Sequence, residues 1–234
     1  MTFAGLLAHS RREFPLSWSD RRPCLGEDTD TTSFDRHYVY HTAWAARMLE
    51  QKRPSLHVDI SSSLYFSAIV SAFIPVHFFD FRPAELTLDN VTLDRADLLA
   101  LPFADGSIVS LSCMHVIEHV GLGRYGDHLD PDGDIKAANE LQRVMAPDGF
   151  LYLVVPVGKP KINFNAHRVY PVEQILDLFS PMVLVEFTLV PDDPAVGGLI
   201  RNATFDLADA QNYGCGCFLF KMPSSSRSEV KRRE

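Results

Sequence analysis

The sequence predicts an α/β fold with a doubly wound, mostly parallel sheet and an antiparallel edge strand. Short apolar runs alternate with segments of helical spacing from about residue 32 to residue 190. This alternation is typical of parallel strands joined by crossover helices that cover both faces of a sheet. No helical pattern separates the last two apolar runs, 182–190 and 215–221, so we expect an antiparallel strand at the edge.

Each expected element follows from the spacing of its apolar residues and from the turn residues beside it. Proline and glycine mark many of the boundaries, as in Pro147-Asp148-Gly149. Ser33 or Thr32 can cap the first helix, which ends before Pro54. The expected helices are 34–53, 65–73, 135–145 and 171–179, and the expected strands are 56–60, 76–81, 91–93, 108–114, 150–155, 182–190 and 215–221.

The composition suits a single globular domain. Of the 234 residues, 46% are hydrophobic and 22% are charged, which is enough apolar material for a sizeable core. We expect an N-terminal arm or lid over 1–31, one domain over 32–222, and a disordered tail over 223–234, which is poor in hydrophobic residues. The net charge of −8 argues against a nucleic-acid partner bound through its phosphates.

Neither a membrane segment nor a disulfide framework is indicated. No apolar run approaches the roughly 18–20 residues that cross a bilayer, so we expect a soluble, cytoplasmic protein without a membrane span. Cys215 and Cys217 are one residue short of the usual C-x-x-C spacing, and no second pair accompanies them. We therefore interpret the four cysteines as reduced and structural, and predict no metal site. No oligomeric state follows from the sequence.

The segment Ala96–Asp127 carries the most specific pattern of the chain. It contains Asp97, then Leu101-Pro102-Phe103, Asp105-Gly106-Ser107, and after a buried strand the run His115–Val120. This progression resembles that of class I S-adenosylmethionine-dependent methyltransferases, and the likeness extends over about 55–221. The later runs GLGRYGD and FNAHRVY are similar to an uncharacterised methyltransferase-like family associated with bacterial surface-polysaccharide synthesis. The resemblance implies a seven-stranded Rossmann-like sheet and S-adenosylmethionine as the cofactor.

The resemblance also implies a cofactor site in the loops that follow four strands. Asp80 would accept hydrogen bonds from both ribose hydroxyls, which the two oxygens of a carboxylate can do. Phe81 would lie against the adenine, Asp97 would meet the adenine amino group, and His115 would lie near the sulfonium. The complete set of expected cofactor-binding residues is Asp59, Ser61, Ser63, Asp80, Phe81, Asp97, Leu98 and His115.

One loop departs from the family pattern. The glycine-rich sequence G-x-G-x-G is replaced here by Ser61-Ser62-Ser63-Leu64-Tyr65. Glycine permits close approach of the backbone to a ligand, and serine is small enough to be tolerated. The ring of Tyr65 could fill the space for the methionine part. Two functions stay open: an enzyme, which we favour, and a non-catalytic methyltransferase-like binding module.

The acceptor site is expected beyond the strand ends, in the two runs of polar residues. A hydroxyl acceptor must lose a proton, and histidine has a pKa suited to accepting one. We predict His119 and His167 as catalytic residues, acting on a small-molecule or glycan acceptor with a hydroxyl or carboxylate group. The residues expected to orient the acceptor are Arg124, Tyr125, Asp127, Asn165, Arg168 and Tyr170.

Two metal-like patterns have simpler explanations. His115, Glu118 and His119 form H-x-x-E-H, which also matches an inverted zinc-protease motif, but a strand leads directly into it where that chemistry needs a helix. The aspartates between 127 and 134 could cap a helix, line the acceptor site or bind a divalent cation. Their spacing does not match a calcium loop, so no metal-binding residue is predicted.

Overall fold

A computed structural model of the chain describes residues 17–224. The chain divides into two units between Phe34 and Asp35. The described part of the first unit, 17–34, contains one 3-10 turn, η1 (Trp18–Asp20), and its side chains are exposed. The arm or lid role of 1–31 remains a prediction, and most of the predicted disordered tail lies outside the described residues.

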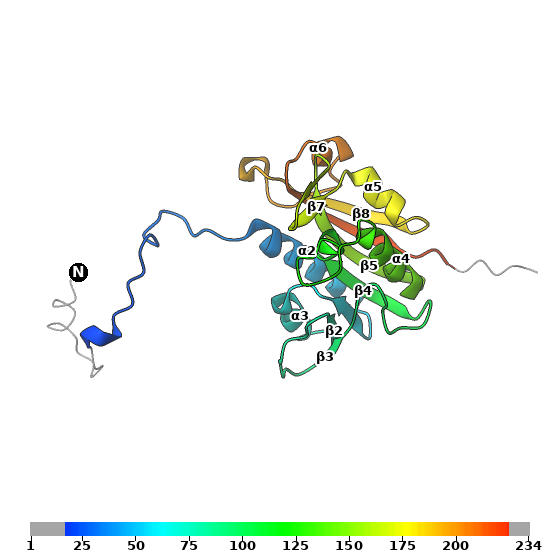
Figure 1. Cartoon of the computed structure of the whole chain (residues 1–234), viewed down its shortest axis with the longest axis horizontal. Coiled ribbons are helices and arrows are strands. Elements are labelled where there is room, and N and C mark those ends of the chain that lie inside the picture. Colours follow the sequence, from blue (N-terminus) through cyan, green and yellow to red (C-terminus); the bar gives the residue numbers. More distant parts are fainter. Residues whose placement is uncertain (1–16, 225–234) are drawn as a thin grey trace, which may run out of the picture. The chain divides into compact units, whose positions relative to one another are not determined.

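A twisted sheet forms the centre of the second unit (Figure 1). Its eight strands lie in the order β3-β2-β1-β4-β5-β10-β8-β9. The pairs from β3 to β5 are parallel, β10 is antiparallel to both β5 and β8, and β9 is antiparallel to β8. The strands are β1 (His57–Ile60), β2 (Val76–Asp80), β3 (Val91–Arg95), β4 (Ile108–Met114), β5 (Met145–Val157), β8 (Val183–Val190), β9 (Ile200–Arg201) and β10 (Gly214–Lys221).

This topology confirms the predicted α/β class and the mostly parallel sheet. The structure adds a short strand, β9, which gives the sheet its antiparallel edge and makes eight strands rather than seven. The last long strand, β10, is antiparallel as expected but lies inside the sheet between β5 and β8. Because β8 and β10 are antiparallel neighbours, no crossover helix is needed between them.

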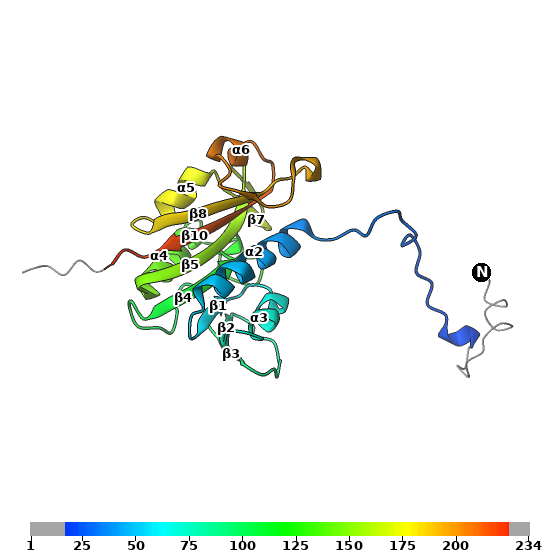
Figure 2. The ribbon, with the colours of Figure 1, turned by 180° about the vertical axis from the view of Figure 1, so that it is seen from behind.

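Helices cover both faces of the sheet. α2 (Arg36–Lys52) and α3 (Leu64–Val70) lie on one face, and α4 (Gly133–Val144) and α5 (Val172–Leu178) lie on the other (Figures 1 and 2). Successive side chains of a strand point to opposite faces, so β5 contributes Tyr152 and Val154 to one core cluster and Leu151, Leu153 and Val155 to the other. A short fifth helix, α6 (Phe205–Asp209), precedes β10.

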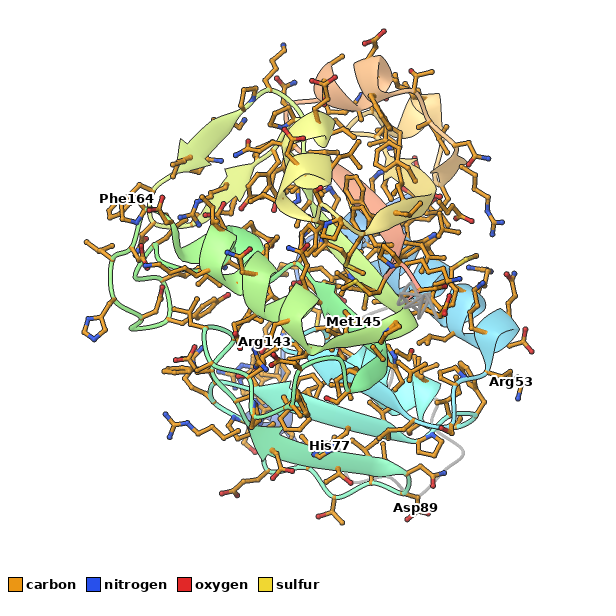
Figure 3. All side chains as sticks on the ribbon, turned by 90° about the vertical axis from the view of Figure 1, so that its right-hand side faces the viewer. Arg53, His77, Asp89, Arg143, Met145 and Phe164 are labelled. Carbon is orange, nitrogen blue, oxygen red and sulfur yellow. The ribbon has the colours of Figure 1, made fainter. Side chains whose placement is uncertain are left out.

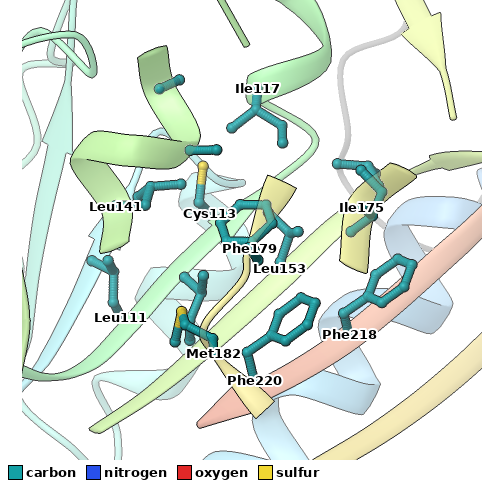
Figure 4. Close-up of a cluster of buried hydrophobic side chains, with 14 of the residues drawn as sticks. Leu111, Cys113, Ile117, Leu141, Leu153, Ile175, Phe179, Met182, Phe218 and Phe220 are labelled. Carbon is teal, nitrogen blue, oxygen red and sulfur yellow. The ribbon is translucent and has the colours of Figure 1, made fainter. Parts of the chain in front are cut away.

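The larger core lies under α4 and α5. Phe179 stacks on Phe220 with ring centroids 5.4 Å apart, and Phe218 lies beside them (Figure 4). All three rings are at most 1% exposed. Burial of one such side chain stabilises the folded state by about 1.5–3 kcal/mol, so this cluster holds the end of α5 against β10.

Element boundaries differ from the predictions where capping and pairing decide them. α2 begins at Arg36 because Asp35 caps it, its carboxylate accepting from the Tyr38 N–H at 3.0 Å. β5 extends from Met145 through two prolines, and the structure adds an unpredicted hairpin of β6 (Lys161–Asn163) and β7 (His167–Val169). Within residues 17–224, no helix combines the length and apolar character that a membrane crossing requires.

Candidate functional site

The carboxyl ends of four parallel strands meet at one edge of the sheet. The Ser61 N–H donates to the Phe79 carbonyl at 2.7 Å, which ties the end of β1 to β2. The Ala96 N–H donates to the Asp80 carbonyl at 3.0 Å and ties β3 to β2. The Met114 N–H donates to Ser62 Oγ at 3.1 Å and ties β4 to the serine loop. The predicted cofactor residues therefore share this edge, where ligands bind in open α/β sheets.

The positions predicted to bind the nucleoside lie at the ends of β2 and β3. One oxygen of Asp80 accepts from the Arg82 N–H at 2.7 Å, and one oxygen of Asp97 accepts from the Leu99 N–H at 2.9 Å. These bonds fix both carboxylates in tight turns. Phe81, which follows β2, is 40% exposed, whereas Leu98, in the turn after β3, is buried.

Asp59 has a different environment from the other predicted carboxylates. It is fully buried and accepts hydrogen bonds from the Ser67 hydroxyl and, at 2.8 Å, from the Ser112 hydroxyl. Burial raises the pKa of Asp59 to about 6, although the serine hydrogen bonds act in the opposite direction. Asp59 therefore braces the loop above it from inside the protein.

The serine loop turns as a glycine loop would. Ser61 has φ +53°, in the left-handed region that glycine usually fills. Tyr65 lies in the first turn of α3, and its ring is 84% exposed rather than packed against the loop. Ser63 and Tyr65 line an open cavity of about 540 Å³, together with Tyr38, Val39 and Thr42 of α2.

A second cavity of about 320 Å³ lies beyond the end of β4. Its volume is within the range of small-molecule sites. Tyr38 lines both cavities. The walls come from the start of α2, the end of β4 with the 3-10 turn η2 (Ile117–His119), the following loop, and the residue before β10. The lining residues are Asp35, His37, Tyr38, His115, Glu118, His119, Arg124, Tyr125 and Tyr213.

His115 lies at the floor of this second cavity. Its φ is +58°, and its Nδ1 is 2.9 Å from a carboxylate oxygen of the fully buried Glu118. Its Nε2 is 3.6 Å from the sulfur of Cys215, and its ring stacks on that of His37 with centroids 5.3 Å apart. Burial lowers the pKa of His115, but the contacts with Cys215 and Glu118 outweigh it and raise the pKa to about 10.

The two predicted catalytic histidines are neighbours. The ring centroids of His119 and His167 are 6.4 Å apart. The Nδ1–H of His119 donates to the Ala166 carbonyl at 2.6 Å, so Nε2 carries the lone pair in the neutral ring. Burial lowers the pKa of both histidines, and only His119 lines the cavity.

One carboxylate fixes the conformation of the loop after η2. Asp127 accepts from the backbone N–H of Gly121 at 2.8 Å and of Tyr125 at 3.1 Å. Arg124 lines the cavity, and its guanidinium donates to the Ala166 carbonyl at 3.1 Å. Arg124 and Tyr125 both line the second cavity, while Asp127 shapes the loop that carries them.

The hairpin of β6 and β7 supplies fewer cavity residues than expected. Asn165 is exposed at the hairpin turn beside Phe164, whose ring is 75% exposed and points outward (Figure 3). Arg168 is buried and donates to the carbonyls of Val120 at 2.7 Å and Pro131 at 3.2 Å. Tyr170 is also buried.

The hydroxyl of Tyr170 donates to Asp134 at 2.9 Å, and Asp134 lies 3.6 Å from the guanidinium of Arg168. These three side chains hold the loop after η2 against β7, because Arg168 bonds to the carbonyls at both ends of that loop. Neither Arg168 nor Tyr170 reaches the cavity wall.

Five residues that line the second cavity had no predicted role in the site: Asp35, His37, Tyr38, Glu118 and Tyr213. Cys215 lies beneath this cavity at the start of β10. The sequence signals for these residues were the H-x-x-E-H pattern that contains Glu118, the C-G-C run, and the spacing of His37 and His41, which places both on one face of a helix.

The family of Caenorhabditis proteins of unknown function DUF268 matches residues 106–190, from the turn before β4 to the end of β8. No curated protein matches the chain. Several solved structures match over most of its length. One is the N-methyltransferase NodS from Bradyrhizobium japonicum in complex with S-adenosylhomocysteine, with 13% identity, a TM-score of 0.56, and coverage of 81% of this chain and 88% of that chain.

Two further structures show the range of proteins with this architecture. The 1,6-didemethyltoxoflavin-N1-methyltransferase of Burkholderia thailandensis, with bound substrate and S-adenosylhomocysteine, has 13% identity and a TM-score of 0.56, over 79% of each chain. The [4+2]-cyclase SpnF has 14% identity and a TM-score of 0.50, over 77% of this chain and 81% of that chain. At this identity the likeness concerns the fold, and the chain therefore has the Rossmann-like fold of these methyltransferases.

Proposed function

We propose that the protein transfers a methyl group from S-adenosylmethionine to a hydroxyl or carboxylate of a small acceptor, such as a sugar derivative. The observation that carries this proposal is the pair of cavities that share Tyr38, one beside the serine loop and one beside His119 and Arg124. A group-transfer reaction needs two adjoining binding places, because its rate depends on holding donor and acceptor in line.

The cofactor would lie along the strand ends. Asp80 and Asp97 are held at the ends of adjacent strands and offer carboxylate oxygens to the ribose and the adenine amino group. Phe81 and Leu98 would contact the adenine, and the turn at Ser61 and Ser63, braced from below by Asp59, would accept the methionine part.

When bound, S-adenosylmethionine supplies an electrophilic methyl group, and the protein supplies position and a proton acceptor. His119 is suited to the second task because Nδ1–H is committed to the Ala166 carbonyl, which leaves Nε2 to accept a proton. Its lowered pKa keeps the ring neutral at pH 7. His167 lies behind it, and Arg124 would orient an anionic group of the acceptor.

We further propose a cytoplasmic role in surface-polysaccharide synthesis. The support is the resemblance of residues 121–127 and 164–170 to the methyltransferase-like family named above. These two segments meet in the structure, because His119 and Arg124 both bond to the Ala166 carbonyl. We retain Arg124 and Tyr125 as acceptor contacts and assign Asp127, Arg168 and Tyr170 to holding the loop.

One observation favours a second function, a non-catalytic binding module. The loop from Ser61 to Tyr65 lacks every glycine of the family pattern. Calorimetric titration with S-adenosylmethionine and S-adenosylhomocysteine separates the two functions. If the protein transfers methyl groups, it must bind both compounds, and Asp80→Asn should weaken that binding. Asp89→Asn is the control and should not weaken it, because Asp89 lies in the turn before β3, at the opposite edge of the sheet from Asp80 (Figure 3). Absence of binding to the folded protein would refute the methyltransferase proposal.

A further inference from the structure

Three potential metal-ligand atoms converge beneath the second cavity. They belong to His37 on α2, His115 after β4 and Cys215 on β10, and all lie within 4.8 Å of one another. We propose that these three residues bind one zinc-type transition-metal ion. The proposal goes beyond methyl transfer and does not depend on it, since it rests on the side chains of this cluster alone.

The spacing of two of these atoms already fits a tetrahedral zinc site. Zinc bonds of about 2.3 Å to sulfur and 2.0–2.1 Å to nitrogen, at a tetrahedral angle, place the two ligand atoms about 3.6 Å apart. Cys215 Sγ and His115 Nε2 are 3.6 Å apart. His37 is only half-buried and lies in the first turn of α2, so its ring can move the short distance that completes the set.

A carboxylate orients the central ligand. Glu118 Oε1 lies 2.9 Å from His115 Nδ1, which holds a proton on Nδ1 and turns Nε2 toward Cys215, where a metal ion would take the place of the Nε2 proton. This carboxylate–histidine–metal arrangement is the usual support of a zinc-binding histidine. Glu118 is fully buried, and its second oxygen has no partner among the described residues. A cation on the far side of the His115 ring would compensate that buried charge.

His41 gives an independent indication of a missing group. It is 0% exposed, and within residues 17–224 neither of its ring nitrogens makes a well-formed hydrogen bond, although the backbone of His37 lies close enough to interact with the ring. Buried polar atoms are nearly always bonded. Its ring lies edge-on to His115, with centroids 5.1 Å apart, and it follows His37 by one helical turn. A water bound to the metal ion would give His41 a partner.

The ligand set selects the kind of ion. Imidazole and thiolate together suit zinc, whereas calcium and magnesium require oxygen ligands. Three protein ligands leave a fourth position, and His37 and His115 both line the second cavity, so that position faces the space beside His119. Such a site would join α2 to the sheet and present an exchangeable ligand position to the cavity.

The test uses the full chain, stripped of metal with a chelator and titrated with Zn²⁺ by calorimetry and with Co²⁺ by absorption. We expect one ion per chain, and a Co²⁺ spectrum with tetrahedral d–d bands and a thiolate charge-transfer band. Cys215→Ala should abolish the charge-transfer band, and His37→Gln should weaken Zn²⁺ binding at least tenfold. The matched control is His77→Gln, a partly exposed histidine on β2 that pairs with Asp94.

The outcomes separate this proposal from methyl transfer. A folded wild-type protein that binds neither ion at micromolar concentration overturns the metal site, as does Co²⁺ binding that Cys215→Ala leaves unchanged. If Cys215→Ala fails to fold, His37→Gln still tests the proposal, because His37 is not part of the buried core around the thiol. A separate titration with S-adenosylhomocysteine uses the zinc-loaded and the zinc-free protein. A protein that binds zinc but not S-adenosylhomocysteine would refute only methyl transfer. A protein that binds S-adenosylhomocysteine but not zinc would refute only the metal site.

Discussion

Replacement of Arg168 by methionine should destabilise the protein strongly. The substitution keeps much of the side chain's length and removes its charge and donors. In the structure, the guanidinium donates to the Val120 carbonyl at 2.7 Å and the Pro131 carbonyl at 3.2 Å, and lies 3.6 Å from Asp134. The residue is 5% exposed, so water cannot readily replace these partners.

The magnitude follows from what is left unpaired. Each buried carbonyl that loses its donor costs about 1–3 kcal/mol. Removing one partner of a buried ion pair costs about 3–5 kcal/mol, because the remaining charge stays buried. The two estimates overlap, and we expect a loss of about 3–5 kcal/mol in the free energy of unfolding. Arg47→Met, an exposed arginine of α2, should change it by less than about 0.5 kcal/mol.

Urea unfolding followed by circular dichroism measures both variants at 25 °C. A loss below about 1 kcal/mol for Arg168→Met would refute the structural role, because the carbonyls and Asp134 would then have other partners. If the affinity for the acceptor fell while stability stayed unchanged, Arg168 would be an acceptor ligand, as its position after the fifth predicted strand first suggested.

Three further predictions concern the site itself. Burial raises the pKa of Asp59 in the folded state from its ordinary value of 3.8 to about 6, so the folded state binds more protons than the unfolded state in this range. Stability should therefore fall by about 2 kcal/mol as pH rises from 4 to 6. Asp59→Asn should remove this dependence in urea unfolding, and an unchanged slope would contradict it. His119→Gln should lower methyl transfer by about 10²–10⁴-fold at unchanged cofactor affinity, and full activity would exclude it as the base. Asp80→Asn should weaken S-adenosylhomocysteine binding at least tenfold by calorimetry, against no change for Asp89→Asn.

The order of elements made one part of the site predictable. Parallel strands place their carboxyl ends at the same edge, so residues that follow β1 to β4 in the sequence had to approach one another. Asp80, Asp97 and His115 all lie at that edge, and the serine loop turns there through a positive φ at Ser61. Periodicity also indicated the helices on both faces, since apolar spacing reflects which side is buried.

Local sequence could not show how distant polar residues are used. The FNAHRVY run is rich in groups that could bind a ligand, and only the surrounding carbonyls reveal that Arg168 is already occupied inside the protein. The exposure of Tyr65 likewise depends on where α3 begins and which way its first turn faces. The identity of residue 65 alone does not define either. A side chain's partners are set by packing, and packing depends on the whole chain.

By itself, the sequence determined the fold class and the edge of the sheet where chemistry would occur, because strand and helix periodicity are local properties. The tertiary structure decided which groups meet there. His37, His115 and Cys215 come from a helix, a strand end and an inner antiparallel strand, and no spacing along the chain links them. Their convergence exists only because β10 enters the sheet beside β5 while α2 packs across it.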